Sequence, residues 1–181
     1  MPKHILFFHG SGSEEGHDTD AALAASLKSK LGASYSIHYP VLTDDGTPDL
    51  GRRQQISREI AASEDGVILV GHSFGASMLL ACLSEMEIRK KIAGIFLMGT
   101  PFWSGDEDWV QAYKLQPDFA KKLNPKIPLF LYHCRDDEEV PFAQLTIYKR
   151  QLPWASIREI PVGGHQLNND LTLVANDIRS L

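Results

Sequence analysis

The chain has 181 residues, of which 43% are hydrophobic and 23% are charged, and its formal net charge is -5. These values are typical of one globular domain. The mildly acidic balance argues against a dedicated nucleic-acid binder, which would carry a basic face. The two cysteines are too few for a disulfide framework, and both are expected to pack in the core.

The start of the chain shows no targeting signal. The apolar stretch at residues 5–8 is too short for a signal peptide and lacks a small-residue cleavage site. No apolar run approaches the length of a membrane span. We therefore expect a cytoplasmic protein that binds neither a membrane nor nucleic acid.

Short apolar runs alternate with longer amphipathic runs along the chain. Strands are expected at residues 3–8, 34–39, 67–70, 92–98, 128–133 and 157–160. Helices are expected at residues 18–31, 49–62, 76–87, 142–151 and 167–178. This alternation predicts the α/β class, with residues 1–181 forming one domain around a doubly wound, mostly parallel sheet of about six strands.

The loop after the first strand is rich in glycine and serine. Residues 10–15 lack the third glycine of a G-x-G-x-x-G fingerprint, and no G-K-[ST] follows them. Both nucleotide-binding fingerprints therefore fail, and a nucleotide-binding enzyme is disfavoured.

The strand at residues 67–70 runs into Gly71-His72-Ser73-Phe74-Gly75, and a helix-prone stretch follows. G-x-S-x-G between a strand and a helix is typical of the turn that holds the nucleophilic serine of an α/β-hydrolase. In such a turn the backbone packs tightly and the serine is strained, so side chains at the glycine positions would clash. An ordinary glycine-rich turn is the competing interpretation. A base and an acid downstream of Ser73 would favour the hydrolase.

Residues 99–124 interrupt the alternation of strands and helices. They leave the carboxyl end of a strand, which is the edge where open α/β sheets bind ligands. Phe102, Trp103 and Trp109 lie in this excursion. We expect them to form a wall of a substrate pocket or an aromatic cluster that seals the sheet edge, and these interpretations are compatible.

A serine hydroxyl needs a neighbouring base, which a carboxylate orients. Two histidines follow Ser73: His133 near the end of a predicted strand, and His165 in a glycine-rich loop after the last one. His165 is the expected base because such a loop lies at the catalytic edge of the sheet. The carboxylate should come from the acidic run at residues 136–139, most of which is expected to be a solvated turn. Spacing alone does not choose among these acids.

Acyl transfer also requires hydrogen-bond donors for the oxyanion. The backbone amide of Phe74, directly after the serine, is one expected donor. The amide of Ser11, in the loop after the first strand, is the other. His9 precedes that loop and joins Phe102, Trp103 and Trp109 as a candidate substrate-binding residue.

Taken together, residues 8–10, 71–75, 135–141 and 163–165 resemble the short α/β-hydrolases related to retinoblastoma-binding protein nine and its bacterial counterparts. The resemblance runs nearly end to end and implies that there is no separate cap domain. It also implies that Asp137 is the acid, because residues 137–141 match the D-x-x-V-P pattern of the superfamily. The L-x-C-x-E motif for pocket-protein binding has no match, since residues 80–84 end in serine, so that partner is not implied.

The combined prediction is a serine hydrolase that cleaves an ester, thioester or small amide through an acyl-enzyme, with the carboxylic-ester type as the expected class. Ser73, His165 and Asp137 are the expected catalytic residues, and a small molecule is the expected substrate. Neither a metal nor an organic cofactor is needed for this chemistry. The alternative is a catalytically silent α/β-hydrolase fold that acts as a binding module.

Overall fold

The computed structural model describes residues 1–11 and 14–181, so Gly12 and Ser13 of the first glycine-rich loop lie outside the described residues. Its strands pair in parallel and form a sheet in the order β2-β1-β3-β4-β5-β6. The strands are β1 (Lys3–Phe8), β2 (Tyr35–His38), β3 (Val67–His72), β4 (Ile92–Met98), β5 (Leu129–Cys134) and β6 (Ser156–Ile160). Each predicted strand is confirmed, with its ends within two residues of the expected positions.

Helices connect the strands. They are α1 (Glu14–Leu31), α2 (Arg52–Ala62), α3 (Ser73–Glu85), α4 (Asp108–Gln111), α5 (Phe119–Lys122), α6 (Gln144–Gln151) and α7 (Thr172–Arg179), with 3-10 turns η1 (Gly32–Ser34) and η2 (Leu167–Asn169). The last helix is shorter than predicted. Leu167, Asn168 and Asn169 have φ angles of 49, 51 and 53°, which a right-handed helix excludes, so α7 begins only at Thr172.

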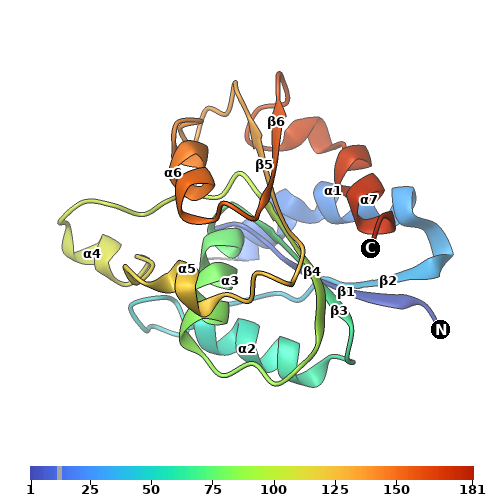
Figure 1. The fold of residues 1–181 in the computed structure, drawn as a ribbon, viewed down its shortest axis with the longest axis horizontal. Helices are drawn as coiled ribbons and strands as arrows, with labels where there is room; N and C mark the ends of the chain where they lie inside the picture. The colour runs from blue at the N-terminus through green and yellow to red at the C-terminus, as the bar shows by residue number, and fades with distance from the viewer. Residues whose placement is uncertain (12–13) are drawn as a thin grey trace.

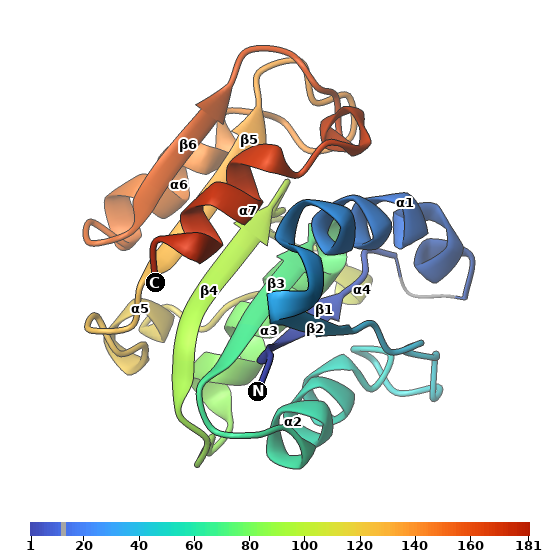
Figure 2. The ribbon, with the colours of Figure 1, turned by 90° about the vertical axis from the view of Figure 1, so that its right-hand side faces the viewer.

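Helices cover both faces of the sheet (Figures 1 and 2). Helices α1 and α7 lie side by side on one face, and α2 and α3 are neighbours on the other. In β3, Ile68 and Val70 belong to the core under α1 and α7, whereas Val67 and Leu69 belong to the core under α2 and α3. Because successive strand residues face opposite layers, this strand is apolar at every one of these positions.

The excursion at residues 99–124 leaves β4 and returns at β5, and it contains the single-turn helices α4 and α5. In Figure 1, α4 lies at the far left, away from the sheet. The main chain of the excursion is held from both sides. The amide of Phe102 donates to Gln144 of α6 at 2.7 Å, and Arg53 of α2 donates to the carbonyl of Ala112 at 2.8 Å.

The cysteines pack in the core, as expected. Cys82 in α3 and Cys134 at the end of β5 are buried and form no disulfide. Burial raises the pKa of Cys82 to about 12 and that of Cys134 to about 11, which keeps both thiols protonated. Among the helices of the described ranges, none is both long enough and apolar enough to cross a membrane.

Candidate active site

Strand β3 turns directly into α3 at Ser73, which has a φ of 51°. Two close approaches force this turn. A Cβ at Gly71 would lie 2.7 Å from the Cα of Ala76, and a Cβ at Gly75 would lie 2.3 Å from the carbonyl oxygen of His9. Only glycine fits at either position, so the turn has the tight packing and the strained serine that the sequence predicted.

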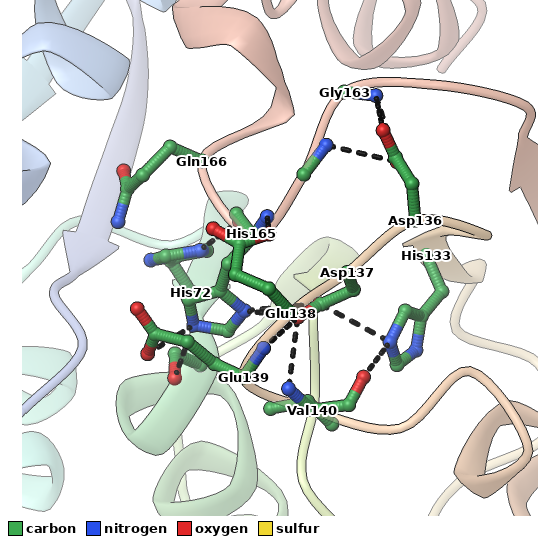
Figure 3. Close-up of polar contacts among 12 residues, drawn as sticks. His72, His133, Asp136, Asp137, Glu138, Glu139, Val140, Gly163, His165 and Gln166 are labelled. Atoms are coloured by element: carbon green, nitrogen blue, oxygen red, sulfur yellow. Dashed lines mark hydrogen bonds and ion pairs between the residues drawn. The ribbon is translucent and has the colours of Figure 1, made fainter.

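The side chains of Ser73, His165 and Asp137 form a continuous series of hydrogen bonds. Ser73 Oγ lies 2.9 Å from His165 Nε2, and His165 Nδ1 lies 2.9 Å from Asp137 Oδ2. The side chains of His165 and Asp137 are 2% and 1% exposed, so bulk water does not compete for their contact. Three segments far apart in the sequence thus meet at the carboxyl edge of the sheet, and Figure 3 shows His165 and Asp137 pointing toward each other.

The acidic run at residues 136–139 is a turn in which Asp136, Glu138 and Glu139 are exposed, as expected, but these acids also contact the His165 loop. Asp136 accepts hydrogen bonds of 2.9 Å from the amides of Gly163 and Gly164, and Glu138 accepts one of 3.0 Å from the amide of His165 (Figure 3). Glu139 is exposed, but its Oε2 lies 3.5 Å from His165 Nε2. Each of the four acids therefore contacts the loop or the imidazole of His165.

Asp137 is the most heavily bonded of these acids. It accepts 2.9 and 2.8 Å hydrogen bonds from the amides of Glu139 and Val140. Burial alone would raise the pKa of this carboxyl, but the hydrogen bonds from His165, Val140 and Glu139 outweigh it, and the pKa is lowered. Asp137 is therefore held as a carboxylate, which is the form that can orient an imidazole.

His133 also reaches this carboxylate. It is a buried residue of β5, and its Nε2 donates to the carbonyl of Val140 at 2.9 Å while lying 3.2 Å from Asp137 Oδ2 (Figure 3). The sequence predicted only a position near the end of a strand. In the structure, His133 supports the Asp137 loop from the side opposite His165.

The loop after β1 passes close over Ser73. A Cβ at Gly10 would lie 3.0 Å from the Cβ of Ser73, and the neighbouring Ser11 has a φ of 57°. Arg52, which is fully buried, reaches the carbonyl of Ser11 with Nη2 at 3.4 Å. Both candidate oxyanion residues, Ser11 and Phe74, line the same cavity as Ser73.

That cavity has a volume of about 560 Å³. Phe102, Trp103 and Trp109 all line it, so the excursion at residues 99–124 borders the hollow beside Ser73. Trp103 is fixed by a 3.0 Å hydrogen bond from its Nε1 to Ser77 Oγ, and its ring meets that of Trp109 edge-on at 6.1 Å. Trp103 and Trp109 thus form an aromatic pair in the wall of the cavity, whereas the ring of Phe102 meets that of Tyr148 at 5.5 Å.

His9 does not lie in the cavity, contrary to its selection as a substrate-binding residue. It is fully buried, Nδ1 donates to the carbonyl of Gly10 at 2.7 Å, and Nε2 accepts from the amide of Leu42 at 3.0 Å. Burial lowers the pKa of His9, which agrees with a neutral ring that has one donor and one acceptor partner. His9 therefore joins two loops and presents no polar atom to a ligand.

Sequence reasoning missed two further residues beside the site. Asp20 of α1 and His72 of the turn are both buried and lie 2.7 Å apart. The only available signal was the histidine in the variable second position of G-x-S-x-G. Within the ranges that the structure describes, no group of three or more His, Cys, Asp or Glu side chains is arranged to hold a metal ion.

A family model described as serine hydrolase matches residues 28–170, which is well over half of the chain. No curated protein matches the chain. Among solved structures, a protein described as a hydrolase of the alpha/beta superfamily from Xanthomonas campestris pv. campestris has 22% identity and a TM-score of 0.66, with 99% of each chain covered.

Two other solved structures are similar in fold. The ydeN gene product of B. subtilis has 18% identity and a TM-score of 0.72, with 99% of this chain and 98% of that chain covered. The thioesterase domain from the curacin biosynthetic pathway has 17% identity and a TM-score of 0.72, with 98% and 91% covered. These likenesses confirm the predicted α/β-hydrolase fold, and the described residues include no separate cap domain.

The tight turn generates a prediction about stability. Gly75→Ala should lower the free energy of unfolding by about 2–4 kcal/mol, because its Cβ would collide with the main-chain oxygens of Phe8 and His9, which cannot move aside independently. Gly66→Ala is the matched control: it has a φ of 85° but no atom within 4 Å, so only backbone strain of about 1 kcal/mol is expected. Denaturant unfolding measures both, and equal losses would contradict the close approach at Gly75.

Proposed function

This chain belongs to the serine hydrolase family, and on that premise we propose that it cleaves a carboxylic ester, thioester or small amide through an acyl-enzyme formed on Ser73. The observation that carries the proposal is the buried hydrogen-bond series from Ser73 through His165 to Asp137. In this series Ser73 is the nucleophile, His165 is the general base and Asp137 is the orienting acid.

The hydrogen-bond distances support the following positions of the protons. The Nδ1–H of His165 donates to the Asp137 carboxylate, which leaves the lone pair of Nε2 to accept the proton of Ser73. As that proton moves to Nε2, Oγ attacks the carbonyl carbon and the carbonyl oxygen takes the negative charge. The imidazolium that forms is stabilised by the Asp137 carboxylate.

Collapse of the tetrahedral intermediate expels the leaving group, which takes the proton from His165 Nε2. Water then repeats the sequence: His165 accepts its proton, the hydroxide oxygen attacks the acyl-enzyme, and the acid departs as Ser73 regains a proton. The backbone amides of Phe74 and Ser11 are the proposed donors to both oxyanions. All of these steps use groups of this chain and water.

The cavity beside Ser73 supports a small acyl or leaving group of apolar or aromatic character. Its volume of about 560 Å³ suits a small-molecule substrate, and its wall includes the rings of Phe102, Trp103 and Trp109. An esterase domain from Rhodothermus marinus and the thioesterase domain from the curacin pathway are among the structures that share this fold. They support ester or thioester hydrolysis as the reaction to test first.

The decisive experiment is labelling with a fluorophosphonate probe, combined with hydrolysis of p-nitrophenyl esters of graded acyl length. The protein should label and turn over esters, and Ser73→Ala should remove labelling and lower kcat/KM by several orders of magnitude. A folded wild-type protein that does not label would instead support a catalytically silent binding module. Unchanged turnover by Ser73→Ala would show that another group is the nucleophile.

The acidic run generates a sharper prediction. Asp137→Asn should lower kcat by about 10³-fold or more, because an amide favours the wrong imidazole tautomer and cannot stabilise the imidazolium. Asp136→Asn is the matched control, since Asp136 bonds only main-chain amides of the His165 loop, and it should lose about 10-fold or less. Both variants are assayed at one pH with the same activated ester. The assignment would be reversed if Asp136→Asn were the inactive variant.

The charge of the cavity predicts selectivity. Among its described lining residues the charged ones are Glu107 and Glu139, and none is basic. An ester with an anionic acyl group, such as mono-p-nitrophenyl succinate, should therefore show a kcat/KM about 10-fold below that of p-nitrophenyl butyrate. Salt at about 1 M should reduce the difference in kcat/KM between the two esters, because it screens the repulsion between the anionic acyl group and the glutamates. Glu107→Gln should reduce this difference at low salt. Equal rates for the two esters at low salt would exclude this selectivity.

A further inference from the structure

The contact between Asp20 and His72 has no part in the mechanism described above. His72 Nδ1 lies 2.7 Å from Asp20 Oδ2, and the two side chains are 1% and 2% exposed. Asp20 belongs to α1, and His72 directly precedes Ser73 at the end of β3. A titratable pair is thus buried immediately behind the proposed nucleophile.

The other nitrogen of His72 determines the protonation of the ring. His72 Nε2 lies 2.9 Å from the main-chain carbonyl oxygen of His165. A carbonyl oxygen can only accept, so Nε2 must carry a proton. The hydrogen bond at Nδ1 also needs a proton, and either the imidazole or the Asp20 carboxyl must supply it.

The surroundings of Asp20 indicate which partner holds that proton. Asp20 Oδ2 also accepts a 2.7 Å hydrogen bond from the amide of Gly10, and Oδ1 accepts one of 3.2 Å from Gln166 Nε2. Burial alone would raise the pKa of Asp20, but hydrogen bonding to His72 and the other donors outweighs it, and the pKa is lowered. Because both carboxyl oxygens accept N–H donors from groups other than His72, the geometry favours a carboxylate at Asp20 and places the shared proton on His72.

The neighbouring histidines His9 and His165 have hydrogen-bond partners that do not require a charged ring. His9 donates from Nδ1 to a carbonyl and accepts at Nε2 from an amide, so it is neutral. At His165, Nδ1 faces the Asp137 carboxylate and Nε2 faces the Ser73 hydroxyl, which can donate a hydrogen bond, so these contacts do not require a second proton on the ring. His72 differs from both because each of its nitrogens faces an acceptor.

We propose that Asp20 and His72 form a permanent carboxylate–imidazolium pair that positions the three loops of the site relative to one another. Asp20 holds Gly10, next to the expected oxyanion residue Ser11, while His72 belongs to the turn that carries the nucleophile. The pair reaches the loop of the base at the carbonyl of His165 and at the side chain of Gln166. Asp20 and His72 are thus positioning residues for the proposed hydrolysis.

The pairing also has an electrostatic function. The rings of His72 and His165 are 4.8 Å apart, so an uncompensated cation at His72 would oppose protonation of His165 during catalysis. The adjacent Asp20 carboxylate makes the pair neutral overall and removes this opposition. Among the residues that the structure describes, Glu15 and Glu139 are the other titratable groups that line the small cavity shared by His72 and His165.

The protonation state can be tested without any substrate. In the protein labelled with ¹⁵N at histidine, long-range ¹H–¹⁵N correlation at about pH 8 should show both nitrogens of His72 protonated, although an ordinary histidine is neutral there. His72→Gln assigns the signal by removing it. Asp20→Asn should leave one unprotonated nitrogen, since its amide can donate to Nδ1 and carries no charge. An unprotonated nitrogen on His72 in the wild-type protein would overturn the proposal, whether or not the variants fold.

The positioning role rests on the proposed function and is tested by a matched pair of variants. In His72→Gln the amide nitrogen falls near the position of Nε2 and retains the bond to His165, whereas in His72→Asn it falls near Nδ1 and the bond is lost. For an activated ester, kcat should fall about 100-fold in His72→Asn and about 10-fold in His72→Gln, with little change in KM. Equal losses would overturn positioning through His165. If the wild-type protein neither labels nor hydrolyses esters, the proposed function fails, while the NMR result still decides the charge of His72.

Discussion

The arrangement of the site depends on one close approach between two segments of main chain. Helix α3 begins directly at the end of β3, and its first turn packs so closely against the end of β1 that Gly75 has no room for a Cβ beside His9. This contact fixes the direction of the new helix and holds Ser73 at a positive φ. The side chain of Ser73 consequently lies close to the loop after β1, which carries Ser11, one of the proposed oxyanion donors.

The partner of Ser73 is positioned by hydrogen bonds to carboxylates. His165 follows β6, the strand at the sheet edge, in a loop whose amides bond the carboxylates of Asp136 and Glu138. Carboxylate bonds to amides are stronger than those between neutral groups, so a short acidic run can define the position of a loop that has little regular structure. Each acid in the run has a different partner. Four acids occur together there because several amides and imidazole nitrogens need a carboxylate partner.

Much of this structure follows from local pattern. The strands were predictable because consecutive residues such as Val67 and Ile68, which face opposite sides of a covered sheet, are both apolar. The turn at Ser73 was predictable because the main chain approaches its flanking glycines too closely for any larger residue. His165 and the acidic run were placed by the rule that loops at the carboxyl ends of parallel strands meet at one edge.

Other features depend on contacts that no local pattern encodes. The pairing of Asp20 with His72 requires a particular rotation of α1 about its axis, and an acid on a helix normally indicates a solvated face. The roles of Asp136 and Glu138 depend on amides more than twenty residues away. His9 was selected because it lies next to the oxyanion loop in the sequence, but the sequence does not show which way its ring points. In the structure the ring points into the protein interior.

The excursion at residues 99–124 carries residues of the substrate pocket, whereas the proposed catalytic residues lie elsewhere in the chain. Ser73, Asp137 and His165 lie outside it, whereas the aromatic wall formed by Phe102, Trp103 and Trp109 lies within it. It leaves the carboxyl end of β4 and returns to the amino end of β5, the neighbouring parallel strand, so a replacement segment has to cross the length of the sheet between two fixed points. Substitutions at the aromatic wall can therefore reshape the substrate pocket without replacing a reacting group, whereas Gly99 at the start of the excursion must stay small, because a Cβ there would lie 3.2 Å from His165 Cε1 and 3.5 Å from Asp137 Oδ2.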